Sequence, residues 1–493
     1  MIANFAGQGW SAIMSLAFVP AYINLMGAES FGLVGVFTSL VGMLAVLDLG
    51  LSQAMTREMA ILSHNKNSFQ QLVNTLRTLE VIYWLVAVVV GLIVLCLANF
   101  IAYQWLKPET LSSVQLLHAL WIMALIIGLR WPVAIYSGGL NGLQKQVLLN
   151  KLLVIFATLQ GAGAFAVLLL FQPTIEAFFI WQAIMAFVQV VILRLALLRS
   201  LPGDGKASFS KDTLRHVWRF AAGMTGVSLV TTVLTQLDKI LLSKILTLSE
   251  LGYYTFAASV AMVIYKIVGP IFTAYYPRLT ELVAKNNQQA LIGSYHEGCQ
   301  LMAVAIIPLT LVLVFFSKEI LEIWTQNPLL VSHTYFLVSL LVIGNALNGL
   351  MHIPYALQLA HGWTKLAFYT NVIAVIILAP AIYFSALHWG AVGAASVWIL
   401  LNISYLLISV HLMYRRILES EKWSWYVDDI GKILLPVLII LIVSKILFTR
   451  DFGLLLNAIF VLVVFFISMT ASIYSAETLR RRLPLTALLR HSK

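Results

Sequence analysis

Charged residues are scarce in this chain of 493 residues. Asp, Glu, Lys and Arg make up 10% of the sequence, whereas hydrophobic types make up 61%. Soluble domains contain about a quarter charged residues. A water-soluble fold of this composition would have to bury nearly all its side chains and would leave little polar surface for solvent. A lipid bilayer removes that requirement, so the composition predicts a membrane protein.

Cysteines and enzyme motifs are also rare or missing. The only cysteines are Cys96 and Cys299, and no C-x-x-C spacing occurs, which excludes a Cys-rich zinc or redox motif. Walker A, HExxH and GxSxG patterns are absent, and the histidines lack ligand spacing. No polar loop is long enough to form a catalytic domain. We therefore expect no catalytic residue, no metal and no cofactor, and we expect that the protein is not an enzyme.

Long apolar stretches fill most of the chain. A membrane-spanning helix needs about 20 mainly apolar residues, and fourteen stretches meet that length. They predict an all-α integral membrane protein with about fourteen transmembrane helices. The predicted spans are 5–26, 31–56, 79–102, 116–138, 148–170, 177–199, 217–243, 252–276, 300–317, 332–358, 366–387, 391–414, 430–448 and 453–475.

The positions of the basic residues predict the direction of the spans. If the N-terminus is cytoplasmic, most of the 31 Lys and Arg residues fall in cytoplasmic loops and flanks, as Lys145 and Arg415 do. Few, such as Lys107, fall outside. This bias is the positive-inside pattern. An error of one span in the middle of the chain would assign the basic residues of the later loops to the wrong side, and the bias would be lost. We expect an even number of spans, with both termini cytoplasmic. The net charge of +11 then reflects topology and requires no nucleic acid.

The two halves of the chain resemble each other at a fixed offset. Gly32 matches Gly252, and Gly142 in LNGLQKQ matches Gly362 in LAHGWTK at the same offset. This repeat predicts two pseudo-symmetric six-helix lobes, parallel in the membrane, a plan that transporters use. The expected parts are an N-terminal lobe (1–199), a cytoplasmic linker (200–216), a C-terminal lobe (217–416), an extra helix pair (430–475) and a basic cytoplasmic tail (476–493).

Several stretches in fixed order carry a family resemblance. They are PAYINLMGAESFGLVGVF, VLDLGLSQAMTRE, YSGGLNGLQKQ, QLDKILLSKILTLSELGYYTFA, PYALQLAHGWTKLAFYTNV and WGAVGAASVWILLN. Together they resemble the polysaccharide flippases of the O-antigen type, in the multidrug/oligosaccharidyl-lipid/polysaccharide exporter superfamily. The resemblance implies a V-shaped two-lobed fold that works by alternating access in the bacterial inner membrane. It further implies a polyprenyl-diphosphate-linked oligosaccharide as substrate, with glycosyltransferases and a polysaccharide polymerase as partners.

Four ionisable residues lie well inside predicted spans, where a charge is costly and usually faces a cavity or a partner. Arg130 and Lys266 lie about midway along spans of different lobes, and Asp238 and Lys239 are adjacent in the seventh span. A diphosphate headgroup needs cations, so we predict substrate-binding roles for Arg130, Lys266 and Lys239. Asp238 is the candidate for coupling to a proton or sodium ion. The alternative for each residue is a structural ion pair or a side chain that reaches the interface.

Two further charges lie toward the cytoplasmic ends of predicted spans. We expect Asp48 to be structural, as a partner for Arg57 or for a helix end, and we expect Arg194 to extend to the interface.

Other functions remain open at this point. A multidrug exporter of the same superfamily would need acidic residues for organic cations, whereas the charge here is mostly basic. A lipid II flippase can share the extra helix pair. A membrane glycan polymerase or transferase would need a large outer loop, and none is predicted. A membrane subunit of a larger polysaccharide secretion complex is the fourth alternative.

Overall fold

The computed structural model describes residues 2–48, 50–62, 69–201, 208–211, 215, 225–448 and 453–482. Nearly all of these residues are helical, and none of them forms a strand. The prediction of an all-α fold is confirmed. Most of the predicted linker 200–216, the start of the predicted span 217–243 and the end of the predicted tail 476–493 lie outside the described residues.

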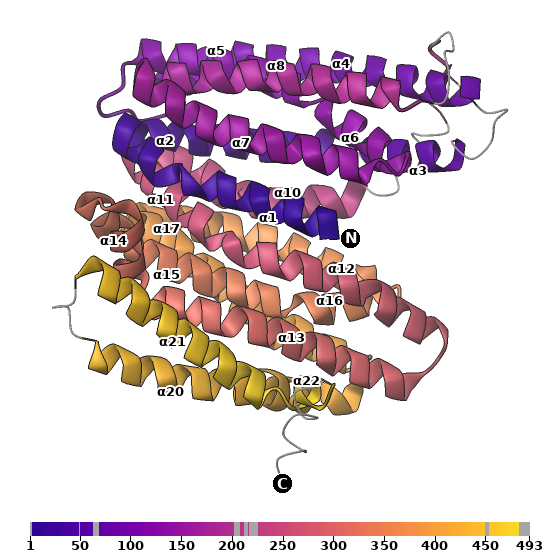
Figure 1. Ribbon diagram of the computed structural model, residues 1–493, viewed down its shortest axis with the longest axis vertical. Helices are drawn as coiled ribbons and strands as arrows, with labels where there is room; N and C mark the ends of the chain where they lie inside the picture. Colours follow the sequence, from indigo (N-terminus) through magenta and orange to yellow (C-terminus); the bar gives the residue numbers. More distant parts are fainter. Residues whose placement is uncertain are drawn as a thin grey trace. The chain divides into compact units, whose positions relative to one another are not determined.

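The chain divides into two compact units, Met1–Gly252 and Tyr253–Lys493. In the first unit, α4 packs on α5, α5 on α8, α1 on α7, α3 on α6, and α10 on α2 (Figure 1). The helix α11 (Leu248–Ala261) carries the chain into the second unit. The helices of the first unit are α1 (Ile2–Ala17), α2 (Val19–Leu44), α3 (Leu51–Leu62), α4 (Phe69–Phe100), α5 (Ser113–Arg130), α6 (Val133–Gly142), α7 (Gln146–Leu170), α8 (Ile175–Arg199) and α10 (Thr225–Ile245).

In the second unit, α13 is the central helix. It packs against α12, α15, α20 and α21. The helices after α11 are α12 (Val263–Ala284), α13 (Gln288–Phe315), α14 (Ser317–Thr325), α15 (Pro328–Leu350), α16 (His352–Ala360), α17 (Thr364–Ser404), α18 (Val410–Tyr414), α19 (Lys422–Ser424), α20 (Lys432–Leu447), α21 (Leu454–Ser475) and α22 (Glu477–Arg482). The predicted division into lobes at 199, 217 and 416 stays a prediction.

Eleven continuous helical stretches among the described residues are long and apolar enough to cross a membrane. One of them, Thr364–Tyr414, turns at Gly390 (φ 56°), between the predicted spans 366–387 and 391–414. The count of fourteen spans stays a prediction. The eleven stretches are Val19–Asp48, Gln70–Trp105, Ser113–Gly142, Gln146–Leu170, Ile175–Arg199, Leu248–Ala284, Gln288–Phe315, Pro328–Ala360, Thr364–Tyr414, Glu419–Leu447 and Leu454–Ser475.

The predicted spans 5–26 and 31–56 differ from the helices that the structure contains. The helix α2 begins inside the first predicted span and turns at Gly27 (φ 83°), and it ends at Leu44, inside the second. A turn at Gly50 (φ 77°) then separates it from α3. The turn at Gly27 directly follows the end of the first predicted span, whereas the turn at Gly50 lies inside the second predicted span, where the hydropathy does not mark it.

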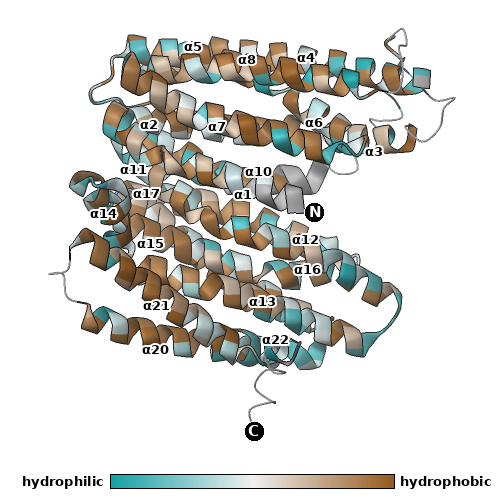
Figure 2. Cartoon of the chain, in the orientation of Figure 1, coloured by the Kyte–Doolittle hydropathy of each residue, from teal (hydrophilic) through white to brown (hydrophobic). Residues whose placement is uncertain are grey.

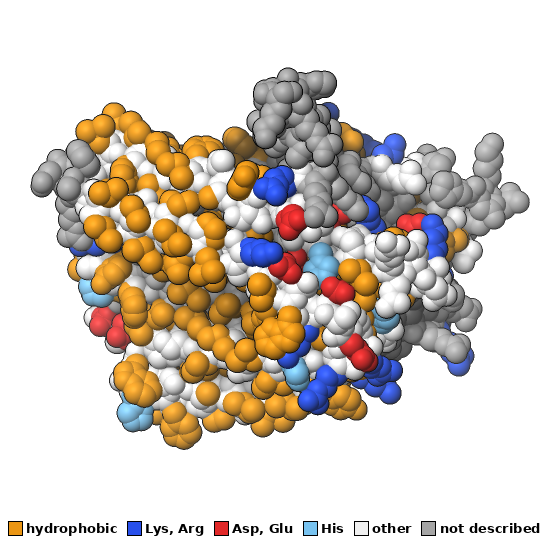
Figure 3. All heavy atoms as spheres, turned by 90° about the horizontal axis from the view of Figure 1, so that it is seen from below, with side chains coloured by type: hydrophobic (Ala, Val, Ile, Leu, Met, Phe, Trp, Pro, Cys, Tyr) orange, Lys and Arg blue, Asp and Glu red, His pale blue; other side chains and the backbone are white. Residues whose placement is uncertain are grey.

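Hydrophobic side chains cover the outside of the helix pair α20 and α21. Ile446 and Leu455, for example, are 76% and 74% exposed. Figure 2 shows hydrophobic residues along most of both helices, with hydrophilic residues gathering near α22. Figure 3 shows the face over these helices, where hydrophobic side chains cover one half and charged side chains gather on the other. An apolar band next to a charged border is the surface that a bilayer requires.

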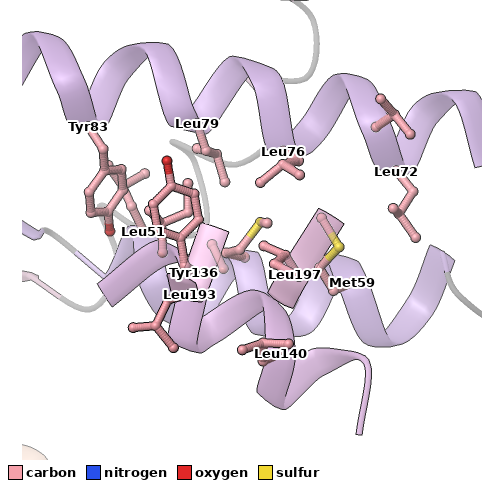
Figure 4. Packing of buried hydrophobic residues seen from close by; sticks show 14 of the residues in the cluster. Leu51, Met59, Leu72, Leu76, Leu79, Tyr83, Tyr136, Leu140, Leu193 and Leu197 are labelled. Atoms are coloured by element: carbon pink, nitrogen blue, oxygen red, sulfur yellow. The ribbon is translucent and has the colours of Figure 1, made fainter. Parts of the chain in front are cut away.

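The core of the first unit includes a cluster of buried residues from α3, α4, α6 and α8 (Figure 4). The helices α3 and α6 approach closely because small residues lie between them. A Cβ atom on Gly138 would lie 2.6 Å from the carbonyl oxygen of Ser52, and one on Gly142 would lie 2.4 Å from that of Thr56. This G-x-x-x-G spacing is typical of helix contacts in membranes.

Candidate substrate-binding residues

Arg130 is the last residue of α5, and it lies at a break within one apolar stretch. After Trp131 and Pro132 the chain continues as α6, so that Ser113–Gly142 as a whole is long enough to span a membrane. Proline has no N–H group and clashes with the preceding turn, which explains the break. The sequence therefore places a cation at a discontinuity in a hydrophobic span.

The Arg130 guanidinium has polar and aromatic neighbours but no acidic one. Its Nη2 donates to Oε1 of Gln182 at 2.9 Å, and it lies over the Phe37 ring, 5.5 Å from the centroid. Its Nε is buried and donates no hydrogen bond. In the described part of the chain, no carboxylate lies within ion-pair distance of Arg130. A half-buried cation without a counterion is costly, and an anionic ligand would offset that cost.

A chain of hydrogen bonds links Arg130 to glutamine side chains of α7 and α8. Gln182 is buried and donates weakly to the carbonyl oxygen of Gln160, at 3.4 Å. Gln160 in turn donates to Oε1 of the buried Gln189 at 3.0 Å. Carboxamides provide donors and acceptors without adding charge. They extend the polar region around Arg130 between the two helices.

Lys239 and Asp238 lie half-buried on α10, which packs against α2, the helix that also carries Phe37. Lys239 makes no hydrogen bond or ion pair to any residue that the structure describes. Because neighbours on a helix point about 100° apart, Asp238 and Lys239 face different directions. The first unit thus contains two cations, Arg130 and Lys239, that make no ion pair with a described carboxylate.

Lys266 lies on α12 in the second unit, and its side chain is exposed. It too makes no hydrogen bond or ion pair within the described ranges. Since it belongs to the other unit, its predicted participation with Arg130 in one site stays a prediction. The ligand roles of Arg130, Lys239 and Lys266 and the coupling role of Asp238 likewise stay predictions.

Arg194 forms an ion pair within the first unit, and its expected position at the interface stays a prediction. Its Nε lies 2.5 Å from Oε1 of Glu80, and Arg77 contacts the other carboxylate oxygen at 3.0 Å. Tyr136 also donates to Glu80, at 2.7 Å. Glu80 is buried, and the two arginines and Tyr136 satisfy its carboxylate, so this group is structural. The i,i+3 spacing of Arg77 and Glu80 is visible in the sequence, but the pairing with Arg194 is not.

Asp48 binds the first turn of α3, the helix end among its two predicted partners, and also contacts Tyr83. It accepts hydrogen bonds from Ser52, at 2.8 Å, and from the Tyr83 hydroxyl. Arg57, the other partner that we expected, instead contacts Glu58 at 2.7 Å. Asp48 therefore joins η1, the helical turn Ala45–Asp48, to α3 and α4.

The second unit contains an acidic pocket that sequence reasoning missed. In a cavity of about 380 Å³, His296 lies between Asp429, at 2.5 Å, and Glu421, at 3.1 Å. Gln300 donates to Asp429 at 3.0 Å and accepts from the backbone N–H of Thr478 at 2.9 Å. These bonds join α13, the π-helical turn Trp425–Gly431 and α22. Carboxylates would repel a diphosphate, so the pocket suits a structural joint better than the predicted substrate.

Comparison with known proteins identifies the family. The model of a family described as "Polysaccharide biosynthesis protein" matches residues 1–283, more than half of the chain, and a second, described as MatE, matches 224–384. A Shigella flexneri protein named "Putative O-antigen transporter" is 22% identical over 387 residues, covering 78% of this chain and 90% of the relative.

Solved structures share the fold. The lipid II flippase MurJ in an inward closed conformation aligns with a TM-score of 0.73 at 15% identity, covering 96% of this chain and 98% of that one. An inward-facing multidrug resistance MATE family transporter aligns with a TM-score of 0.59 at 13% identity, covering 84% and 95%. The resemblance in the sequence is confirmed. The chain is a multi-pass membrane protein with a transporter fold, and it belongs to the polysaccharide biosynthesis protein family, within the multidrug/oligosaccharidyl-lipid/polysaccharide exporter superfamily.

Proposed function

We propose that the protein is a flippase that carries a polyprenyl-diphosphate-linked oligosaccharide across the bacterial inner membrane. It would supply surface polysaccharide or lipopolysaccharide synthesis and would work by alternating access. Both termini would be cytoplasmic, with glycosyltransferases making the substrate on that side and a polymerase consuming it on the other. The family and the Shigella flexneri relative support this class of substrate.

The observation that carries the proposal is the environment of Arg130. A guanidinium held by Gln182 and Phe37, without a described carboxylate, is suited to bind an anion inside the membrane. The headgroup of a polyprenyl-diphosphate lipid carries its charge where it meets the sugar. Arg130 would therefore bind the diphosphate, and the carboxamides of Gln160 and Gln189 would lie next to the first sugars. Lys239 and Lys266 would add further cations.

An organic-cation exporter fits these residues less well. Its site would need acidic side chains, whereas three of the four candidate residues inside predicted spans are basic. Asp238 is the exception, and we assign it to ion coupling.

A lipid II flippase is the second candidate, and the structural comparison favours it specifically. The alignment with MurJ covers 96% of this chain, whereas the MATE transporter covers 84%. Lipid II also presents a diphosphate, so Arg130 alone does not separate the two substrates.

Complementation of two bacterial strains separates them. One strain lacks its O-antigen flippase, and the other is depleted of its lipid II flippase. We expect the protein to restore surface polysaccharide in the first strain, given the matching glycosyltransferases, and not to restore growth in the second. The reverse result would identify a lipid II flippase. Failure in both, despite normal protein levels in the membrane, would contradict the proposal.

A further inference from the structure

One face of α12 carries aromatic side chains. Tyr265, Phe272 and Tyr276 follow one another at helical spacing, so they lie on the same face of the helix. All three side chains are half-buried. Gly269 lies beside them on this face, and a Cβ atom there would meet nothing within 4 Å. The aromatic residues therefore border open space.

The helix α16, which packs against α12 (Figure 1), adds two more rings to this face. Phe272 is at the centre. Its ring is nearly parallel to that of Tyr276, at 5.7 Å and 11°, and to that of Tyr355 on α16, at 6.2 Å and 17°. The ring of His352 meets Phe272 at 6.0 Å and 89°, and Tyr265 at 6.1 Å. We call these five residues the aromatic platform, and all of them belong to the second unit.

Two hydroxyl groups of the platform have no partner in the described part of the chain. Tyr265 donates to Oδ1 of Asn348 at 3.1 Å. The hydroxyls of Tyr276 and Tyr355, in contrast, make no hydrogen bond to any residue that the structure describes. A tyrosine hydroxyl both donates and accepts, so these two groups are available to a polar ligand.

The position of Lys266 shows what this side of α12 faces. Lys266 directly follows Tyr265, is exposed, and lies at the middle of the apolar stretch Leu248–Ala284. The exposed Thr273 lies on the same side of the helix, next to Gly269. A charge at this depth is costly in lipid. Because Lys266 makes no ion pair within the described ranges, its side of the helix faces water and not acyl chains.

We propose that the aromatic platform binds a sugar ring of the lipid-linked oligosaccharide. A pyranose has an apolar C–H face and hydroxyl groups around its edge. The C–H face would pack on the rings around Phe272, and the edge hydroxyls would bond to the hydroxyls of Tyr276 and Tyr355. The platform rests on the proposed function and adds a sugar site to it, in the second unit and separate from the diphosphate contact of Arg130. Sites that combine apolar surface with a few placed polar groups are typical of small-molecule recognition.

Binding of two lipids to the purified protein tests the platform. One is a polyprenyl-diphosphate oligosaccharide, and the other is the same polyprenyl diphosphate without sugar. Phe272→Leu should lower the affinity for the sugar-bearing lipid about three- to tenfold, because it removes the stacked ring. Tyr276→Phe and Tyr355→Phe keep the rings and remove one hydroxyl each, and each should lower the same affinity about three- to tenfold. All three variants should bind the sugar-free lipid as the parent does, which also shows that they are folded.

Two further variants are controls. Phe272→Tyr keeps an aromatic ring at the centre of the platform and should retain most of the affinity for the sugar-bearing lipid. Phe384→Leu makes the same change as Phe272→Leu on α17 of the same unit, at a side chain that is 60% exposed and outside the platform. Its affinities for both lipids should equal those of the parent.

The two lipids separate failure of the platform from failure of the proposed function. Unchanged affinity of all three platform variants for the sugar-bearing lipid would overturn the platform. Equal weakening for both lipids would also overturn it, because the residues would then not act on the sugar. Either result leaves the flippase proposal intact. A parent protein that binds neither lipid would contradict the proposed function itself, and the platform with it.

Discussion

Arg130→Ala should weaken binding of the lipid-linked substrate without destabilising the protein. The variant loses a charge-assisted contact to phosphate, worth about 1.5–3 kcal/mol, which corresponds to a loss of affinity of about ten- to a hundredfold. Arg130 has no described counterion, and its Nε is buried without a hydrogen bond. Removing it therefore also removes the cost of burying an unpaired cation, and we expect an unchanged or higher melting temperature.

Arg194→Ala is the matched control in the same unit. Arg194 binds the buried Glu80 at 2.5 Å, so its removal leaves that carboxylate with fewer partners and should destabilise the fold by about 1–3 kcal/mol. We therefore expect opposite effects on stability: Arg194→Ala should destabilise the fold, and Arg130→Ala should not. Arg130→Lys should keep part of the binding, because the charge remains while the bidentate geometry is lost.

Substrate binding by the purified protein and thermal unfolding in the same detergent are the two assays. Near-normal binding of a polyprenyl-diphosphate oligosaccharide by Arg130→Ala would refute the ligand role. A fall in its melting temperature as large as that of Arg194→Ala would mean that Arg130 is a structural residue.

Three further predictions concern the other candidate residues and the topology. Lys239→Gln and Lys266→Gln should each lower the rate of glycan export in cells at unchanged protein levels, and normal export in both would confine the cationic site to Arg130. Asp238→Asn should slow flipping in proteoliposomes and weaken its dependence on an imposed proton gradient, whereas gradient-sensitive transport at the normal rate would exclude the residue from coupling. Alkaline phosphatase fused at Lys107 should be active and a fusion after Arg482 inactive, and the opposite pattern would reverse the predicted orientation.

The helical content and the class of fold follow from the composition, because only helices can satisfy their backbone groups within apolar stretches of this length. The boundary between the predicted spans 366–387 and 391–414 coincides with the turn at Gly390. The turn at Gly27 likewise lies between the predicted spans 5–26 and 31–56, whereas the turn at Gly50, inside 31–56, does not show in the hydropathy. Beside Gly50, Asp48 contacts Tyr83, a residue far from it in the sequence, and hydropathy cannot show such a contact.

Part of the candidate site can also be predicted from the sequence, and part depends on tertiary contacts. An arginine in an apolar stretch before a proline is visible in the sequence, and the structure places Arg130 at such a break. Whether a charge is satisfied depends on tertiary partners. Arg194 looked similar in the sequence, but Glu80, which lies far away along the chain, binds it. The acidic pocket around His296 and Asp429 was missed because its residues come from separate helices without a motif.

Transport by the purified protein in proteoliposomes tests the central claim most directly. The substrate is a polyprenyl-diphosphate oligosaccharide with a labelled sugar, and a membrane-impermeant glycosidase reports how much of it reaches the outer leaflet. We predict that the wild-type protein accelerates its appearance there and that Arg130→Ala does not. No acceleration by the wild-type protein, combined with export of organic cations from the same vesicles, would contradict the account.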